Sequence, residues 1–179
     1  FGGTCTNAGC IPSKALLEST ELYHKTKDEL GVHGIKVSGV TFAVAQMQKR
    51  KTGIVKASTT GIAMLLKSAG VTALQGHGKL LAGRKVEFTA HDGKKETLSA
   101  KHIVLASGSI PTELKSMAFD GKNIVDNWGA LDFDSVPKKL AVVGAGVIGL
   151  ELGSVWRRLG SEVVILEARD AFLAVADQG

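Results

Sequence analysis

Apolar residues follow helical spacing in two long stretches of the N-terminal part of the chain. The first, Pro12–Leu30, has its proline in the first turn, where a helix tolerates it, and Gly31 follows as a stop signal. The second, Phe42–Ala69, ends at Gly70. Its apolar positions are Val44, Met47, Ile54, Val55, Ile62, Leu65 and Leu66. The pattern predicts two helices, although glycines and threonines near the middle of the second disfavour helix there.

The apolar period then shortens to that of β-strands. Turn signals such as Ala-Gly-Arg and His-Asp-Gly-Lys separate five short runs. The predicted strands are Val71–Gln75, Lys79–Leu81, Val86–Thr89, Glu96–Leu98 and His102–Ala106. We interpret them as a β-meander that leads into a final apolar strand.

The last part of the chain shows a strand, a glycine turn, a helix and a second strand. Residues 107–137 have little periodicity, but Leu140–Val143, Val147–Leu159 and Glu162–Leu166 read as a βαβ unit, which implies a parallel sheet. The predicted fold class is therefore α/β, with a Rossmann-like βαβ unit beside a β-meander. We divide it into a first domain (1–112), a connecting segment (113–137) and the first part of a second domain (138–179).

Composition narrows the function classes. Hydrophobic residues make up 44% and charged residues 22%, as in soluble globular chains, and no run approaches the ~20 apolar residues of a membrane span. The net charge of +5 is scattered and aromatic residues are only 5%, which disfavours nucleic-acid binding. Two cysteines suit neither a disulfide framework nor, alone, a four-ligand zinc site, and the five histidines lack metal-ligand spacing. We expect no metal, no nucleic acid and no membrane partner, and a cytoplasmic location.

The remaining charged and aromatic residues receive simple interpretations. Lys49-Arg50-Lys51 and the pair Lys138-Lys139 read as solvated faces, and Trp128 and Trp156 as core or interface residues. The chain starts at Phe1 without methionine and stops at Asp-Gln-Gly. We interpret it as a piece of a longer protein.

A glycine motif follows the strand that begins at Leu140. In a Gly-x-Gly-x-x-Gly turn, the first glycine (Gly144) permits a tight turn, the second lets the backbone approach a pyrophosphate, and the third allows close helix–strand packing. The helix N-terminus supplies N–H groups for phosphates. Glu167, after the next strand, would accept hydrogen bonds from ribose hydroxyls and repel a 2′-phosphate, which favours NAD over NADP, although Arg169 lies nearby. The candidate NAD-binding residues are Gly144, Gly146, Val147, Ile148, Gly149 and Glu167.

The two cysteines, Cys5 and Cys10, form the second motif. In an ideal helix their Cα atoms would lie roughly 8–9 Å apart, whereas a disulfide needs at most about 7 Å. They can pair only if the segment between them is distorted, which Asn7 and Gly9 permit. Two buried free cysteines are the commoner alternative. The flanking glycines and the nearby Lys14 favour redox chemistry at a helix N-terminus.

Both motifs, with their flanks, resemble a known family. Gly-Gly-Thr-Cys-Thr-Asn-Ala-Gly-Cys-Ile-Pro-Ser-Lys resembles the redox segment of the flavoprotein disulfide reductases. The extension Ala-Leu-Leu-Glu-Ser and the later Gly-Ala-Gly-Val-Ile-Gly-Leu-Glu-Leu-Gly-Ser-Val-Trp are most similar to the bacterial dihydrolipoamide dehydrogenases. Glutathione and mercuric reductases share the cysteine motif, but glutathione reductases usually carry Lys where Ser13 stands and prefer NADP.

The resemblance implies roles for individual residues. Cys5 matches the thiol that exchanges with the dithiol substrate, and Cys10 matches the thiol next to the flavin. Lys14 resembles the family lysine near the flavin, with Glu151 as its ion-pair partner; ordinary surface charge is the alternative for both. Positions close to FAD are matched by Gly78, Ser107, Gly108 and Ser109. Ser107 stands where relatives more often have Thr, which keeps the hydroxyl.

The resemblance also implies the activity. The expected enzyme is an NAD-dependent, FAD-containing homodimer that oxidises the lipoyl domains of 2-oxo acid dehydrogenase complexes. The family's FAD fingerprint is expected before Phe1, and the interface domain with its His–Glu base after Gly179. This piece alone is then expected to be inactive. Sibling disulfide reductases and a non-catalytic NAD-binding or thiol-redox module remain the alternatives.

Overall fold

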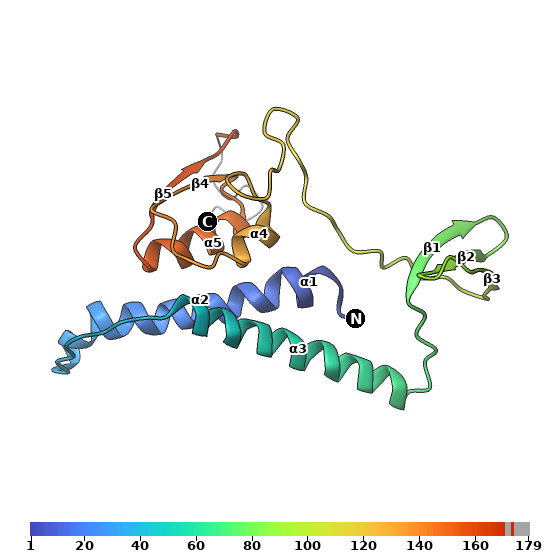
Figure 1. Cartoon of the computed structure of the whole chain (residues 1–179), viewed down its shortest axis with the longest axis horizontal. Helices are drawn as coiled ribbons and strands as arrows, with labels where there is room; N and C mark the ends of the chain where they lie inside the picture. The colour runs from blue at the N-terminus through green and yellow to red at the C-terminus, as the bar shows by residue number, and fades with distance from the viewer. Residues whose placement is uncertain (171–172, 174–179) are drawn as a thin grey trace. The chain divides into compact units, whose positions relative to one another are not determined.

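The computed structural model describes residues 1–170 and residue 173, and the chain divides into two units (Figure 1). One unit contains residues 60–108 together with Phe1. The other contains residues 2–59 and the described residues from Ser109 onward. Among the described residues, no helix combines the length and the apolar character that crossing a membrane requires.

The chain begins with two helices separated by one glycine. Helix α1 spans Gly3–Ala8 and helix α2 spans Cys10–His24. Pro12 lies in the first turn of α2, where its missing N–H costs nothing. The α-helix ends earlier than the sequence predicts: Lys25–Glu29 form a π-helix and Leu30–His33 a 3-10 helix. The expected stop at Gly31 is therefore wrong, and the helical path instead ends at Gly34, which has a φ of 74°.

Two side-chain contacts accompany the change of helix type. The Thr26 hydroxyl donates to the Leu22 carbonyl at 2.7 Å, and His24 Nδ1 lies 3.0 Å from a carboxylate oxygen of Asp28. Such local bonds compete with the regular backbone ladder. The sequence pattern predicts the apolar face but not this change in winding.

Helix α3 spans Val44–Ser68, which confirms the second predicted helix. It continues through Gly53 and Gly61 without interruption. In its N-terminal part, Val44 and Met47 are partly buried and pack against the apolar core. Partial burial of apolar residues along one face offsets the low helix propensity of the glycines.

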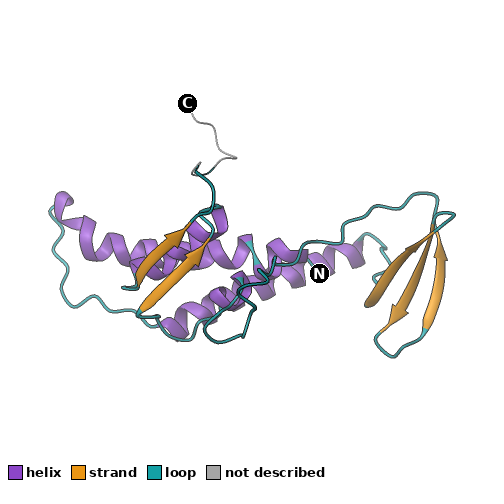
Figure 2. Cartoon of the chain, turned by 90° about the horizontal axis from the view of Figure 1, so that it is seen from above, coloured by secondary structure: helices purple, strands orange, loops and turns teal. Residues whose placement is uncertain are grey.

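The unit that contains residues 60–108 holds a three-stranded antiparallel sheet in the order β1-β2-β3 (Figure 2). The strands are β1 (Gly76–Leu81), β2 (Lys85–Ala90) and β3 (Lys95–Ser99), so the three central predicted strands are confirmed. The outer two, residues 71–75 and 102–106, are not strands. Neither has a neighbouring strand among the described residues, and without one the backbone ladder cannot form.

The predicted βαβ unit is present. Strands β4 (Lys139–Val143) and β5 (Glu162–Leu166) pair in parallel, and helix α5 (Val147–Arg158) connects them. Helix α5 lies between α2 and this pair of strands (Figure 1). The sequence misses a short helix, α4 (Asn127–Leu131), within the segment that it predicts to be a connection. Asp126 caps it by accepting a hydrogen bond from the N–H of Gly129 at 2.9 Å.

The core of the larger unit forms where α2, α4 and α5 meet. Trp156 is 1% exposed, donates its indole N–H to the Ala130 carbonyl at 3.1 Å and packs against the Phe133 ring. The fully buried apolar cluster consists of Leu16, Leu131, Leu152, Val155, Trp156 and Leu159. Trp156 is thus a core residue as predicted, whereas Trp128 is 42% exposed.

Candidate redox and nucleotide site

A disulfide joins Cys5 in α1 to Cys10, the first residue of α2. Their Cα atoms are 4.6 Å apart, and both residues are exposed. The sequence predicts an irregular segment between them, but the structure has a short helix and a single break at Gly9. The alternative of two buried free cysteines is therefore wrong.

The break at Gly9 brings the two cysteines together. Gly9 has φ −143° and ψ −113°, so the helical path is interrupted at this residue alone. A Cβ atom on Gly9 would lie 3.1 Å from the Thr4 carbonyl oxygen and 3.2 Å from the Cα of Cys5. A larger residue would push the two helices apart, because the chain passes so close to itself here.

The position of Cys10 favours a reactive thiol. A helix N-terminus carries a partial positive charge, and helix α2 has 15 residues that align their dipoles toward Cys10. Reduction of the disulfide would place a thiolate at this end, where the dipole stabilises it. Cys10 and Lys14 are one helical turn apart and both are exposed, so they share a face of α2. An exposed thiol beside an ammonium is chemically suited to a flavin ring.

Glu151 connects helix α5, which follows the glycine turn, to helix α2. One carboxylate oxygen lies 2.5 Å from Lys14 Nζ, and the other accepts the Ser13 hydroxyl at 3.0 Å. The ion pair expected between Lys14 and Glu151 is thus present. Ser13 is buried and also contacts the Cys10 carbonyl at 3.1 Å. The carboxylate is held by two neighbouring residues of α2, directly after the redox segment.

Three further hydrogen bonds hold the redox segment from outside. The Thr4 hydroxyl donates to the Ser109 carbonyl at 3.1 Å and accepts its N–H at 3.4 Å. The Asn127 side-chain amide donates to the Ala8 carbonyl at 3.1 Å. The segment before each cysteine is therefore tied to a residue more than 100 positions away in the sequence.

The glycine turn between β4 and α5 has the geometry of a dinucleotide site. Gly144 has a φ of 105°, which favours glycine, and a Cβ atom on Gly149 would collide with the Gly144 carbonyl and with Val142. Gly146 caps α5, and open space surrounds the position of its missing Cβ. The first turn of the helix, Val147 and Ile148, is exposed. These features fit a pyrophosphate approaching the helix N-terminus.

Glu167 lies across this turn. One carboxylate oxygen accepts the N–H of Ala145 at 2.8 Å, and the other accepts the N–H of Arg169 at 2.9 Å. These two hydrogen bonds hold the pKa of Glu167 below its ordinary value, with the Ala145 bond the larger cause. The carboxylate is therefore ionised and fixed at the glycine turn, at the end of β5.

The positions expected near FAD fall into two sets. Ser109 contacts Thr4 of the redox segment, whereas Gly78, Ser107 and Gly108 belong to the other unit. Gly78 lies in β1, and a Cβ there would meet only Val86 at an ordinary 3.6 Å. Gly108 has a φ of 78°, which favours glycine. The described residues contain no cluster of three or more His, Cys, Asp or Glu suited to a metal ion.

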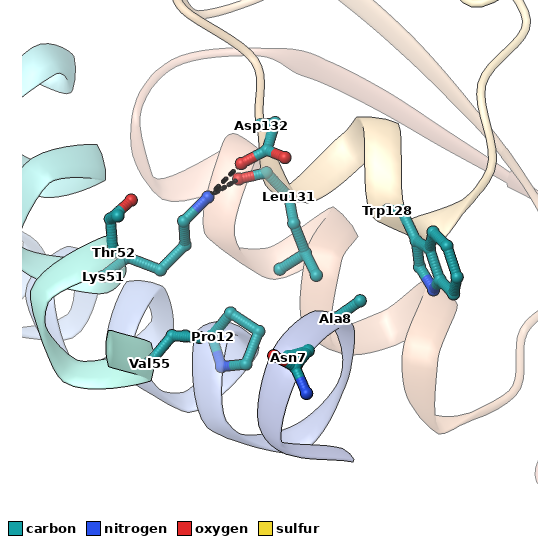
Figure 3. Close-up of a pocket in the computed structure, with 9 residues that line it drawn as sticks. All are labelled: Asn7, Ala8, Pro12, Lys51, Thr52, Val55, Trp128, Leu131 and Asp132. Atoms are coloured by element: carbon teal, nitrogen blue, oxygen red, sulfur yellow. Dashed lines mark hydrogen bonds and ion pairs between the residues drawn. The ribbon is translucent and has the colours of Figure 1, made fainter. Parts of the chain in front are cut away.

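Within the basic run on α3, the structure contradicts the predicted environment of Lys51. Lys51 is only 5% exposed; its ammonium donates to the Leu131 carbonyl at 2.8 Å and pairs with Asp132 (Figure 3). Arg50 donates to the Ala15 carbonyl at 2.8 Å and pairs with Glu18. Lys49 and Arg50 are exposed as predicted, so the predicted solvated face is wrong only for Lys51. The local sequence gives little indication of these contacts, because the carbonyl acceptors come from distant segments.

Lys51 and Trp128 line a small pocket next to the redox segment. The pocket has a volume of about 270 Å³ and is lined by residues of helices α1, α2, α3 and α4, with Asn7, Ala8 and Pro12 opposite Lys51 and Asp132 (Figure 3). Lys51 supports helix α4, the element that the sequence pattern misses, through the Leu131 carbonyl. An aspartate cap before Asn-Trp-Gly-Ala-Leu is the one sequence signal that predicts it.

Comparison with known proteins gives the family. Residues 1–179 match the family described as pyridine nucleotide-disulphide oxidoreductase, and the chain belongs to it. The expected resemblance and the α/β flavoprotein fold class are thereby confirmed. The solved structure of LpdA from Mycobacterium tuberculosis aligns with a TM-score of 0.85 over 97% of this chain and 38% of its own, at 27% identity.

Curated relatives point to one branch of the family. Dihydrolipoyl dehydrogenase of Cupriavidus necator is 52% identical over 179 residues, which is all of this chain and 38% of the relative. Dihydrolipoyl dehydrogenase 1, mitochondrial, of Arabidopsis thaliana is 48% identical over 93% of this chain and 33% of its own length. The chain thus spans little more than a third of these relatives.

Proposed function

We propose that this chain supplies the redox disulfide and the first part of the NAD site of a dihydrolipoamide dehydrogenase. Such an enzyme oxidises dihydrolipoyl groups with NAD⁺ through a disulfide and FAD. The main observation in support of this proposal is the Lys14–Glu151 ion pair. It links the helix that bears Cys10 to the helix that follows the glycine turn. The names of the relatives from Cupriavidus necator and Arabidopsis thaliana support the choice of substrate.

The chemistry at the disulfide is thiol exchange. A substrate thiolate attacks the sulfur of Cys5, the Cys5–Cys10 bond breaks, and Cys10 leaves as a thiolate. The second substrate thiol then attacks the mixed disulfide, which releases the cyclic disulfide product and the Cys5 thiol. Two electrons thereby pass from the dithiol to the cysteine pair. When bound, FAD would take this electron pair and deliver it to NAD⁺ as hydride.

The other residues hold charge and position. Helix α2 stabilises the leaving Cys10 thiolate through its dipole, and Lys14 adds a positive charge on the same exposed face. Glu151 fixes the lysine and, through Ser13, the first turn of α2. Lys14 and Glu151 would therefore position the redox helix against the flavin.

The NAD site is proposed from the glycine turn. Gly144, Gly146 and Gly149 shape the turn, while Val147 and Ile148 supply exposed first-turn N–H groups. The Glu167 oxygens retain lone pairs beyond those used by Ala145 and Arg169, so they can also accept ribose hydroxyls. An ionised Glu167 would repel a 2′-phosphate, which favours NAD over NADP.

The wider assignments follow from the family. Residues 1–112 would form part of the FAD domain, 113–137 the connection and 138–179 part of the NAD domain, with Gly78 and Ser107–Ser109 near FAD. The enzyme would be a homodimer acting on lipoyl domains of 2-oxo acid dehydrogenase complexes. A cytoplasmic location is supported by the bacterial relative, whereas the Arabidopsis relative is named mitochondrial.

A steady-state assay of the full-length protein tests the proposal. We expect turnover with dihydrolipoamide and NAD⁺ and little with glutathione disulfide and NADPH. Turnover with only the second pair would assign the chain to a sibling disulfide reductase. Failure to bind FAD and to turn over either pair would favour the non-catalytic module.

A further inference from the structure

Asn127 contacts the backbone between the two cysteines. It is the first residue of α4, and its side-chain amide donates to the carbonyl of Ala8 at 3.1 Å. Ala8 is the last residue of α1 and directly precedes the break at Gly9. The hydrogen bond therefore acts on the backbone between the two cysteines.

Helix α1 has little stability of its own. It has six residues, while an isolated helix shorter than about 12–15 residues is marginal in water. The last carbonyls of a helix lack partners within it, and Ala8 is such a residue. The amide of Asn127 satisfies this carbonyl and ties the end of α1 to a second element.

Helix α4 is itself held firmly. Its Leu131 carbonyl accepts Gln48 Nε2 at 3.0 Å and the buried Lys51 ammonium at 2.8 Å. Its Ala130 carbonyl accepts the indole N–H of Trp156 from the core. Through Asn127, the firmly held helix α4 therefore restrains the backbone of the redox segment.

We propose that Asn127 is a positioning residue that favours the closed Cys5–Cys10 disulfide over the dithiol. The hydrogen bond restricts the backbone at Ala8 and raises the effective concentration of one thiol near the other. The closed disulfide fixes the backbone geometry at Ala8, whereas the reduced pair of thiols leaves this backbone free to relax. The inference rests on the proposed redox role of the cysteines and concerns their equilibrium, not the identity of the substrate.

The test measures the disulfide–dithiol equilibrium in the full-length protein. Asn127→Asp keeps the shape but replaces the donor with an acceptor, and Asn127→Ala removes the group. Each sample is equilibrated anaerobically with dithiothreitol and its cyclic disulfide, and thiols are counted by alkylation and mass. Each reduction transfers two electrons and two protons from one dithiothreitol. We expect both variants to shift the equilibrium toward the dithiol by roughly two- to tenfold.

Asn123→Asp is the matched control. Asn123 is an exposed asparagine in the same segment, four residues before Asn127, and its substitution is expected to leave the equilibrium unchanged. Equal equilibria in wild type and both Asn127 variants would overturn the proposal. A shifted equilibrium without dihydrolipoamide turnover would instead refute only the proposed function.

If the Asn127 variants fail to fold, a measurement on the wild-type protein tests the proposal instead. If the bond favours the closed disulfide, reduction must weaken the bond by the same free energy, because the coupling is reciprocal. Amide hydrogen exchange of peptides covering Asn127–Leu131 is then expected to rise on reduction, whereas β2 is expected to be unaffected. Unchanged exchange in α4 would contradict the inference.

Discussion

Glu151 Oε1 lies 2.5 Å from Lys14 Nζ, so the helix after the glycine turn provides the counter-ion of a lysine beside the redox disulfide. The lysine side chain is 59% exposed and the glutamate side chain 21%. An exposed pair of this kind contributes little to stability. Its value therefore lies in positioning.

Glu151→Gln is expected to affect activity more than stability. The amide keeps a bond to Ser13 but loses the charge that holds Lys14. We expect the free energy of unfolding to fall by about 1 kcal/mol or less. The turnover rate of the full-length enzyme is expected to fall roughly tenfold or more, because a charge-assisted hydrogen bond is lost at the redox helix. Urea unfolding and steady-state rates check this; loss of stability in proportion to activity would contradict it.

Lys51→Met is expected to destabilise the larger unit. The substitution leaves the Leu131 carbonyl with one donor fewer and removes a buried cation from Asp132. We expect a loss of about 2 kcal/mol, measured by chemical denaturation. Lys49→Met, two residues away on the exposed side of α3, is the matched control and is expected to change stability by less than about 0.5 kcal/mol. Equal effects would mean that Lys51 is not buried.

The glycine turn gives a pair of substitutions with opposite expectations. In Gly149→Ala the new methyl group meets the Gly144 carbonyl and the Val142 side chain, which lies 2.9 Å away. Overpacking of this kind costs about 1–3 kcal/mol, so the melting temperature is expected to fall. Gly146→Ala meets open space at a φ of −74° and is expected to preserve stability while weakening NAD binding. Calorimetry and NAD titration separate the two; NAD affinity unchanged in Gly146→Ala would argue against close approach of the pyrophosphate.

Glu167 gives a pH-dependent prediction. Its pKa is lowered in the folded state, chiefly by the Ala145 N–H, so its ionised form contributes stability above the unfolded pKa. That contribution is lost as the pH falls through the folded pKa. The stability difference between wild type and Glu167→Gln is therefore expected to shrink from pH 7 toward pH 3. A difference that stays constant with pH would show that the carboxylate is not held by these N–H groups.

The same variant tests coenzyme choice. Removing the charge of Glu167 removes the repulsion of a 2′-phosphate. The ratio of kcat/KM for NADP⁺ to that for NAD⁺ is expected to rise in Glu167→Gln. An unchanged ratio would place the selectivity elsewhere.

Local sequence patterns predict the helices, strands and turns that depend on residues close together in the sequence. The βαβ unit, helix α3 and the three central strands follow from apolar period and turn residues, and the glycine turn follows from its spacing. The Lys14–Glu151 pair came from family resemblance. Residues 71–75 and 102–106 have strand-like sequences but no strand partner among the described residues, so propensity alone could not decide them.

What the sequence missed depends on distant partners. Lys51 resembles a solvated lysine until the Leu131 carbonyl, 80 residues away, is brought beside it. In the sequence, Asn127 resembles a residue of a connecting segment. Only the structure shows that it begins α4 and donates a hydrogen bond to the Ala8 carbonyl. Short polar side chains that bind backbone carbonyls carry no periodic signal, so only the fold identifies them.

Anaerobic titration of the full-length protein with dihydrolipoamide tests the central claim most directly. If the Cys5–Cys10 disulfide accepts electrons from a dithiol beside a bound flavin, two-electron reduction is expected to produce long-wavelength absorbance, and Cys10→Ser is expected to abolish it. NAD⁺ is then expected to return the oxidised spectrum. A colourless protein, or a flavoprotein whose spectrum does not respond to dihydrolipoamide, would contradict the proposed function.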